Sequence, residues 1–578
     1  MRPCAALLVL VACSSGQKAA PSADVGQSAA GRNADADSRF EALARRYVDD
    51  DLERHPESAT RLGEHKYDAR LNDRSRVARE RDIAATRETL AALKQIPVAQ
   101  LSADNSTDAR ILENRLEGTL YELEVIRDWE WNPLGYNVGG SLNGLIVREF
   151  APARVRLQSA IGRLQMVPDV IAAAKANLKN PPEVFTKTAI QQNQGTIGLV
   201  EKQFQPLAQE APDLAPAFRA AQAKAVAALR DYQDWLSRDL LPRSTGDFRL
   251  GKEKFERKLR YALDSDIPAS EILARAEADL VATQDAMYRT ALQIRPSNKT
   301  DKHQVIKDAL DAAAMVHPTN ATILDLARKD LVEATAFVKQ RDFVSVPNQP
   351  LEVTPTPEFA RGVAVASCNP PGALEKNGKT FYFISPTPAD WTQKRVDTFF
   401  REYDDDMLQE VTIHEAMPGH YLQLAHANQF RAPTLIRALA YSGTFTEGWA
   451  TYAEQVMAEE NYGGPRVHLQ QEKMRLRFII NAIIDQKIHT AGMTEQDAVD
   501  LMMKEGFQEE AEAVGKWKRA QLSSTQLSTY YVGNLEMNEM RAGWEKKHGK
   551  GNDLKKFHDA LLSFGSPPPK YVKERLGL

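Results

Sequence analysis

The stretch TIHEAMPGHYLQ, residues 412–423, contains two histidines on either side of a Pro-Gly pair. His414 and His420 are six residues apart. A straight helix would place them about 240° apart around its axis and about 9 Å apart along it. Two imidazoles so placed cannot share one ion, because zinc ligands lie about 2.0–2.2 Å from a common point. On a regular helix, therefore, they would be only capping or core histidines.

The Pro-Gly pair predicts that this helix is not regular. Pro418 has no N–H to donate to the carbonyl of His414, and Gly419 accepts backbone angles that other residues avoid. We expect the helix to break between Ala416 and Gly419. His420 would then begin a new segment that points back at His414, and the pair would be able to bind one metal ion.

A second motif supplies a carboxylate. In GTFTEGWATYAEQVM, residues 443–457, Glu447 follows His420 by 27 residues, a spacing similar to that of glutamate-type zinc peptidases. Glu454 lies on the same helix face seven residues later, but we expect Glu447 to be the third ligand, after His414 and His420, of a Zn²⁺ ion. Catalytic zinc sites use three protein ligands and leave one position open.

The N-terminus has the pattern of a secretory signal. MRPCAALLVLVACSSGQ has one arginine, a short apolar run and the sequence Leu-Val-Ala-Cys before small polar residues. We predict a lipoprotein signal peptide over 1–12, lipid attachment to Cys13 and a flexible tether over 13–37; ordinary cleavage that leaves a free cysteine is the alternative. These features predict an exported protein that is anchored in a bacterial cell envelope. Ser14 resembles a signal for the outer membrane, facing the periplasm.

The rest of the chain predicts a large helical fold. Its 578 residues are 43% hydrophobic, and the net charge of −4 gives no basic surface for nucleic acid. Helical periodicity begins near residue 38, and a proline-rich part favours a small β ribbon near 350–385. We expect a mainly α, zincin-like fold with possible lobes 38–345 and 346–578 around a deep cleft. Cys368 is the only cysteine of the folded part, so no internal disulfide is expected.

Both motifs resemble a bacterial family known as domain of unknown function 885. Its pattern H-E-A-x-P-G-H-x-x-Q appears as His414 to Gln423, and E-G-W-A-x-Y-x-E appears as Glu447 to Glu454. The family is similar to helical, gluzincin-type zinc metallopeptidases. The resemblance thus implies a mostly α fold with a deep cleft.

Two further segments resemble the family less completely. RAQLSSTQLSTYYVG keeps Arg519, Gln526, Tyr530 and Gly533 at matching spacing, but Ser524-Thr525 replaces a Pro-Gly pair. The family's D-x-G-L-H appears as DQKIH, which ends at His489. Its Asp–His pair would line the cleft or form an ordinary helix contact.

Together these features predict a zinc-dependent peptidase that cleaves short peptides. Glu415 would take a proton from the attacking water and pass it to the leaving amine, and Tyr530 or Arg519 would donate to the oxyanion. We expect Tyr382, on an edge strand that pairs with the peptide, and His489 to contact the substrate. The alternatives are a zinc hydrolase of other amides or esters, and a non-catalytic, lipid-anchored metal-binding protein. The oligomeric state stays open.

Overall fold

Amphipathic helices make up most of the computed structural model, which describes residues 34–356, 364–375, 378–389, 391–549, 551 and 553–578. The fold is mainly helical with one small three-stranded sheet, as predicted. The predicted signal peptide and Cys13 lie outside the described residues. The tether was predicted to reach residue 37, but α1 begins at Ala34. The residues before Phe40 extend this helix toward the N-terminus. No helix of the described part is long and apolar enough to cross a membrane.

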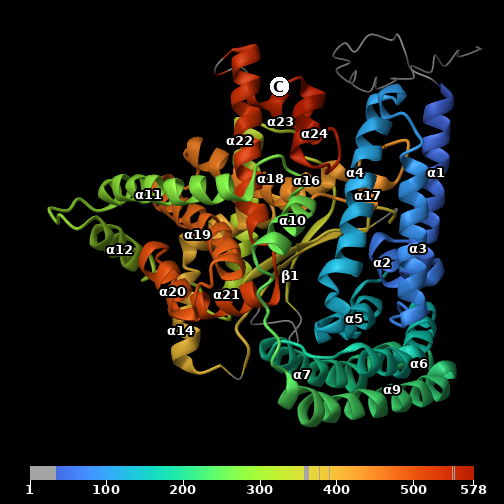
Figure 1. Ribbon diagram of the computed structural model, residues 1–578. Helices are drawn as coiled ribbons and strands as arrows, with labels where there is room; N and C mark the ends of the chain where they lie inside the picture. The colour runs from blue at the N-terminus through green and yellow to red at the C-terminus, as the bar shows by residue number, and fades with distance from the viewer. Residues whose placement is uncertain (1–33, 357–363, 376–377, 390, 550, 552) are drawn as a thin grey trace, which may run out of the picture.

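The N-terminal helices form two cores. One lies among the first four helices, and the other lies among the five that follow. In Figure 1 the longer helices of the first group stand along one side of the molecule, and those of the second lie across its lower end. The helices are α1 (Ala34–Arg54), α2 (Pro56–Leu62), α3 (Arg76–Leu93), α4 (Ala103–Tyr121), α5 (Gly139–Val147), α6 (Ala153–Asn177), α7 (Glu183–Gly198), α8 (Gln205–Glu210) and α9 (Ala215–Trp235).

The middle helices pack against the C-terminal ones. The middle helices are α10 (Lys252–Leu263), α11 (Ala269–Ile294), α12 (Lys302–Ala313) and α13 (Ile323–Arg341). The later helices are α14 (Gln393–Glu402), α15 (Asp405–Glu415), α16 (His420–Ala427), α17 (Ile436–Leu439), α18 (Gly443–Glu459), α19 (Gly464–Thr490), α20 (Glu495–Asp500), α21 (Glu510–Leu522), α22 (Ser528–His548), α23 (Leu554–Leu562) and α24 (Pro569–Leu576).

This packing does not follow the predicted division into lobes 38–345 and 346–578. Helix α11 packs along α19, and α13 packs against α15, so both middle helices share cores with later parts of the chain. Even the first core includes Ile436 and Tyr571. The change from helices to strands at 345 is a change of local structure and not of core, and the division into lobes stays a prediction. The deep cleft between lobes stays a prediction.

The predicted β ribbon is a sheet of three strands in the order β1-β3-β2. β1 (Leu351–Pro355) runs parallel to β3 (Thr380–Ile384), and β2 (Ala366–Asn369) runs antiparallel to β3. Side chains of β3 alternate between buried and half-buried positions, as expected of a strand with one face on the core. β3 is therefore the central strand, and β2 is an edge.

Candidate metal centre

The chain bends sharply between the two histidines. Helix α15 ends one residue after His414, and α16 begins at His420, which confirms the break predicted from the Pro-Gly pair. A Cβ on Gly419 would lie 1.9 Å from the carbonyl oxygen of His414, so only glycine fits there. The indole Nε1 of Trp449 donates a hydrogen bond of 2.8 Å to the carbonyl oxygen of Pro418. Helix α18 thus holds the bend in place.

The bend brings His414 and His420 onto Glu447 of α18. One ligand atom from each of these side chains lies within 4.8 Å of the other two. Oε2 of Glu447 is 3.7 Å from Nε2 of His414 and 3.3 Å from Nε2 of His420. Donors about 2.1 Å from one tetrahedral ion are about 3.4 Å apart. The distances from Glu447 to the two histidines are therefore close to those between ligands of one zinc ion. We call these three residues the histidine–glutamate cluster.

The charges of the cluster suit a cation. Nδ1 of His420 and Oε2 of Glu447 are buried without a hydrogen-bond partner in the described part of the chain. Burial by itself would raise the pKa of Glu447, but the two imidazoles outweigh it and lower that pKa. Burial by itself would lower the pKa of His414, but the nearby carboxylates of Glu447 and Glu454 raise it well above its usual value. Glu447 therefore stays ionised and offers an oxygen with no other partner.

Glu454 supports His414 from behind. Its Oε1 lies 2.5 Å from Nδ1 of His414, on the opposite side of the ring from Glu447, and its side chain is fully buried. A carboxylate in this position fixes the orientation of the ring and makes it a better metal ligand. Glu410 lies beyond it; burial, and then Glu454, raise the pKa of Glu410 well above its usual value. The preference for Glu447 over Glu454 as a ligand agrees with this geometry, whereas the sequence analysis missed Glu410.

Glu415 extends beside the cluster and not into it. Its Oε2 accepts a hydrogen bond of 2.8 Å from the backbone N–H of Cys368 in β2. The side chain is half-buried, so the carboxylate is held near the cluster but not sealed from solvent. Nothing in the sequence pattern predicts that β2 positions this carboxylate, because the two segments are 47 residues apart.

Two glycines let α18 approach α22. A Cβ on Gly448 would lie 2.6 Å from the backbone of Gly533, so neither helix accepts a side chain at the contact. Ala450, two residues further along α18, is also fully buried, but the glycine pair sets this crossing. The crossing brings Tyr530 of α22 toward Glu447. Burial, and then the charge of Glu447, raise the pKa of Tyr530, so its hydroxyl keeps its proton.

Arg519 lies next to Tyr530. Its Nη2 donates to the side-chain oxygen of Gln526 at 2.7 Å and to the hydroxyl of Tyr530 at 3.2 Å. The sequence predicted both Tyr530 and Arg519 for the site, and the structure brings them together. Tyr530 lies on α22 near its crossing with the helix of Glu447, and Arg519 contacts Tyr530 from α21.

The position of His489 corrects its expected role. The ring is 3% exposed, stacks on Phe255 and donates from Nε2 to the carbonyl oxygen of Ser523. Burial lowers the pKa of His489 to about 4, so the ring is neutral. It is therefore not placed to touch a substrate. Together with Asp485, which accepts from the backbone N–H of Thr525, it anchors the turn that precedes α22.

Tyr382 is likewise a core residue and not a substrate contact. Its side chain is fully buried, and its hydroxyl hydrogen-bonds Thr412 at 2.9 Å beneath α15. The expected edge strand is also wrong, because β3 is paired on both sides and cannot accept a further strand. Strand order depends on contacts between distant segments, so the local pattern could not distinguish the central strand from the edge.

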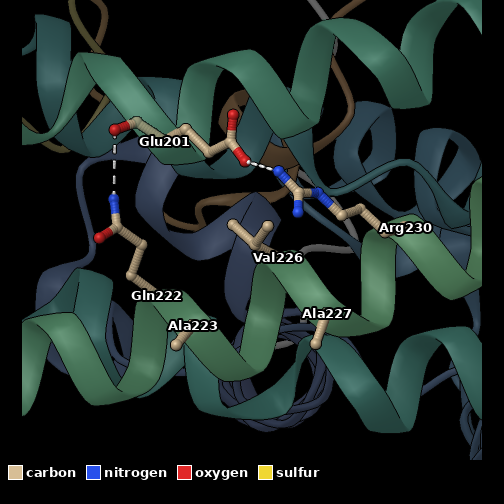
Figure 2. A pocket seen from close by; sticks show the side chains of 6 residues that line it. All are labelled: Glu201, Gln222, Ala223, Val226, Ala227 and Arg230. Carbon is tan, nitrogen blue, oxygen red and sulfur yellow. Dashed lines mark hydrogen bonds and ion pairs between the residues drawn. The ribbon is translucent and has the colours of Figure 1, made fainter.

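A surface hollow in the N-terminal helices was a possible alternative site. It measures about 380 Å³ and is lined by residues of α9 and by Glu201. Glu201 pairs with Arg230 at 2.6 Å, and its carbonyl oxygen accepts a hydrogen bond of 3.3 Å from Gln222 (Figure 2). Alanine and valine line the rest. The polar groups of this hollow satisfy one another, so nothing in it calls for a ligand.

The fold and the site define a class: a large helical protein with a buried His-His-Glu cluster at a broken helix. A family model matches residues 56–576, and the chain belongs to that family, described as "Bacterial protein of unknown function (DUF885)". The predicted family resemblance is thus confirmed. The relation of the family to zinc peptidases stays a prediction.

Solved structures share the fold. A "putative lipoprotein of unknown function" from Shewanella oneidensis is 32% identical, with a TM-score of 0.78 over 93% of this chain and 100% of that one. A "putative lipoprotein" from Colwellia psychrerythraea is 17% identical, with a TM-score of 0.77 over 94% of this chain and 98% of the other. No curated protein matches the chain. These descriptions agree with an envelope lipoprotein.

Proposed function

We propose that this protein is a zinc-dependent peptidase that cleaves short peptides. The observation that carries the proposal is the meeting of His414, His420 and Glu447 within 4.8 Å, with Glu415 next in sequence to one of them but outside the group. A structural zinc site closes all four positions with protein ligands and has no use for an adjacent base. Three ligands and a free carboxylate are the set that hydrolysis needs.

The donor set fits zinc. Two imidazole nitrogens and one carboxylate oxygen are ligands that Zn²⁺ accepts, and Glu454 supplies the supporting hydrogen bond that zinc-binding histidines normally have. Zinc bound there would acidify a water molecule toward neutrality and polarise the carbonyl of the substrate.

Glu415 is the proposed general base. Its Oε2 is held by the Cys368 N–H, while Oε1 is left to accept a proton from the attacking water. The same carboxyl group then passes this proton to the leaving amine nitrogen.

Tyr530 is the proposed donor to the oxyanion. Because its pKa is raised, the hydroxyl is a stable donor at neutral pH. Arg519 donates to the oxygen of Tyr530, which makes the hydroxyl proton a better donor. We therefore assign the contact with the reacting carbonyl to Tyr530 and a supporting place to Arg519.

The edge strand β2 offers a place for the peptide. The N–H of Cys368 points away from β3 and toward Glu415, so the open side of β2 faces the proposed base. A peptide in extended form that pairs along this edge would lie beside Glu415. β2 takes over the role that the sequence analysis gave to the strand of Tyr382.

We further propose that the chain is exported and held by a lipid on Cys13, on the periplasmic face of the outer membrane. The Leu-Val-Ala-Cys sequence and the descriptions of both relatives support this. Labelled fatty acid should enter the wild-type protein and not Cys13→Ser. Equal labelling of both would contradict lipidation at this residue.

The test of function is metal analysis combined with mass spectrometry of products. The purified protein should hold about one zinc ion per chain. It should shorten members of a mixed peptide pool, lose this activity with a chelator and regain it with zinc. Small esters and lactams in parallel assays would reveal another hydrolase activity. Stoichiometric zinc without turnover of any of these substrates would favour the non-catalytic alternative.

A further inference from the structure

Arg519 carries an unpaired positive charge beside the proposed oxyanion donor. Other arginines, such as Arg401 and Arg477, pair with the carboxylates of Asp311 and Glu402. Among the residues that the structure describes, none places a carboxylate in ion-pair contact with Arg519, and its side chain is exposed. Its partners are a neutral amide and a neutral phenol. The guanidinium therefore keeps its full charge available for a ligand.

The orientation of Arg519 leaves donors free. Only Nη2 hydrogen-bonds within the described chain, to Gln526 and Tyr530. The Nε and Nη1 groups have no such bond there. A guanidinium offers five N–H donors in a rigid plane, and adjacent pairs of them match the two oxygens of a carboxylate. Neutral partners thus orient this group without using its charge.

The surrounding turn is rigid. Asp485 accepts from the N–H of Thr525 at 2.9 Å and from the N–H and hydroxyl of Ser528 at 3.0 and 2.7 Å. Asp485 is fully buried, and its carboxylate accepts hydrogen bonds from the backbone of this turn. The side chain that contacts Arg519 is the neutral Gln526. The turn would therefore present Gln526 and Tyr530 in the same place before and after a ligand binds.

Lys516 adds a second cation one turn earlier on the same face of α21. Its Nζ lies 3.8 Å from Glu512, beyond hydrogen-bond distance. Burial lowers the pKa of Lys516 to about 8, and Arg519 contributes to this as a nearby like charge. Most of the lysine is still protonated at neutral pH. Lys516 thus adds positive charge near Arg519, although the carboxylates of Glu512 and Glu402 offset part of it.

We propose that Arg519, supported by Lys516, binds the C-terminal carboxylate of the peptide, so that the enzyme removes residues from the C-terminal end. This inference rests on the proposed peptidase function. Tyr530 contacts Arg519 and stands on α22 near its crossing with the helix of Glu447. A peptide whose end is held by Arg519 would therefore present a carbonyl near its C-terminus to Tyr530 and Glu415. Arg519 would also bind the carboxylate of an acidic side chain. Peptides that carry only one of these two carboxylates distinguish the alternatives.

Binding is measured first, in the Glu415→Gln protein so that the peptide is not consumed. Calorimetry compares acetyl-tetraalanine with its C-terminal amide and with an amidated peptide that contains one glutamate. We expect the free acid to bind about tenfold or more tightly than either amide, because a charged pair of hydrogen bonds is lost without the carboxylate. Arg519→Met should abolish this preference, and Arg519→Lys should restore part of it.

Lys518→Met is the matched control, because it removes the positive charge of a half-buried lysine next to Arg519 on the same helix. It should keep the preference, and circular dichroism should show that all variants are folded. Equal binding of acid and amide, a preference that survives Arg519→Met, or no saturable binding of any peptide would overturn the inference. Tighter binding of the amidated glutamate peptide than of the free acid would assign Arg519 to an acidic side chain instead.

Cleavage then separates this inference from the proposed function. The wild-type enzyme should shorten free-acid peptides from the C-terminus and cleave their amides about tenfold or more slowly. Cleavage of acid and amide at one rate would remove the C-terminal role and leave the peptidase. Binding that prefers the acid, without cleavage of any peptide, would remove the peptidase and leave a carboxylate-binding site.

Discussion

The histidine–glutamate cluster and the hollow on α9 differ in how their polar atoms are satisfied. In the hollow, Glu201 and Arg230 pair with each other, and Gln222 bonds to the backbone. In the cluster, Nδ1 of His420 and Oε2 of Glu447 are buried without such partners. Buried polar groups without partners cost free energy unless a ligand satisfies them. Buried polar atoms without partners therefore identify this site better than the size of a hollow does.

The largest expected effect tests the cluster directly. Glu447→Ala should remove zinc from the purified protein and abolish turnover, because it deletes one of three ligands. We expect the loss of zinc affinity to exceed the roughly 100-fold that a missing supporting partner costs. Elemental analysis after dialysis measures it. Glu459→Ala, at an exposed glutamate of the same helix, should keep its zinc. Stoichiometric zinc in Glu447→Ala would show that another residue is the third ligand.

Glu415→Gln should separate metal binding from chemistry. The amide still accepts the hydrogen bond from the Cys368 N–H but cannot take a proton from water. Zinc content should stay at the wild-type level while turnover falls by about 10³-fold. Steady-state kinetics together with metal analysis give both values. Activity close to that of the wild type would remove Glu415 from the proton transfer.

Glu454→Gln should have a smaller effect, because it weakens the support of His414 without deleting a ligand. A neutral amide accepts a weaker hydrogen bond from Nδ1 than a carboxylate does. Zinc affinity, measured by competition with a chelator, should fall by about 10- to 100-fold. Glu410→Gln is the matched variant. Since the Glu410 carboxyl hydrogen-bonds no metal ligand among the described residues, and burial and Glu454 raise its pKa toward the uncharged form, zinc affinity should change little. Equal effects of the two substitutions would contradict the supporting role of Glu454.

Thr525→Gly tests strain in the turn that carries Gln526. Thr525 has φ of 72°, the left-handed region that a β-branched residue avoids. Glycine should raise the free energy of unfolding by about 1 kcal/mol, after the loss of backbone freedom in the folded state is included. The midpoint of urea unfolding measures it. Thr525→Ala keeps a Cβ and should give no such gain, and a less stable glycine variant would contradict strain here.

Much of the site could be predicted from the sequence because its causes are local. Pro418 and Gly419 determine the bend, and the bend determines where His420 points. The family motif that contains Glu447 also contains Gly448 and Trp449, which set the approach of α18 to α22 and hold the bend.

The rest depends on contacts between distant segments. The central place of β3, and with it the burial of Tyr382, follows from strand order, which no local pattern encodes. His489 was expected to face the site, but its neighbour in space is the Ser523 carbonyl, 34 residues away. The division of cores follows the packing of α11 along α19, which is equally non-local.

The smallest expected effect concerns the hollow on α9, and it tests whether this hollow takes part in function. The double variant Glu201→Gln and Arg230→Met removes the ion pair of Figure 2 while keeping similar side-chain volumes. Arg230 is 66% exposed, so water screens the pair, and its loss should change the free energy of unfolding by no more than about 0.5 kcal/mol. Zinc content, turnover and peptide binding should all stay at wild-type values. A loss of turnover in this variant, with zinc retained, would mean that the hollow takes part in function although its polar atoms are satisfied.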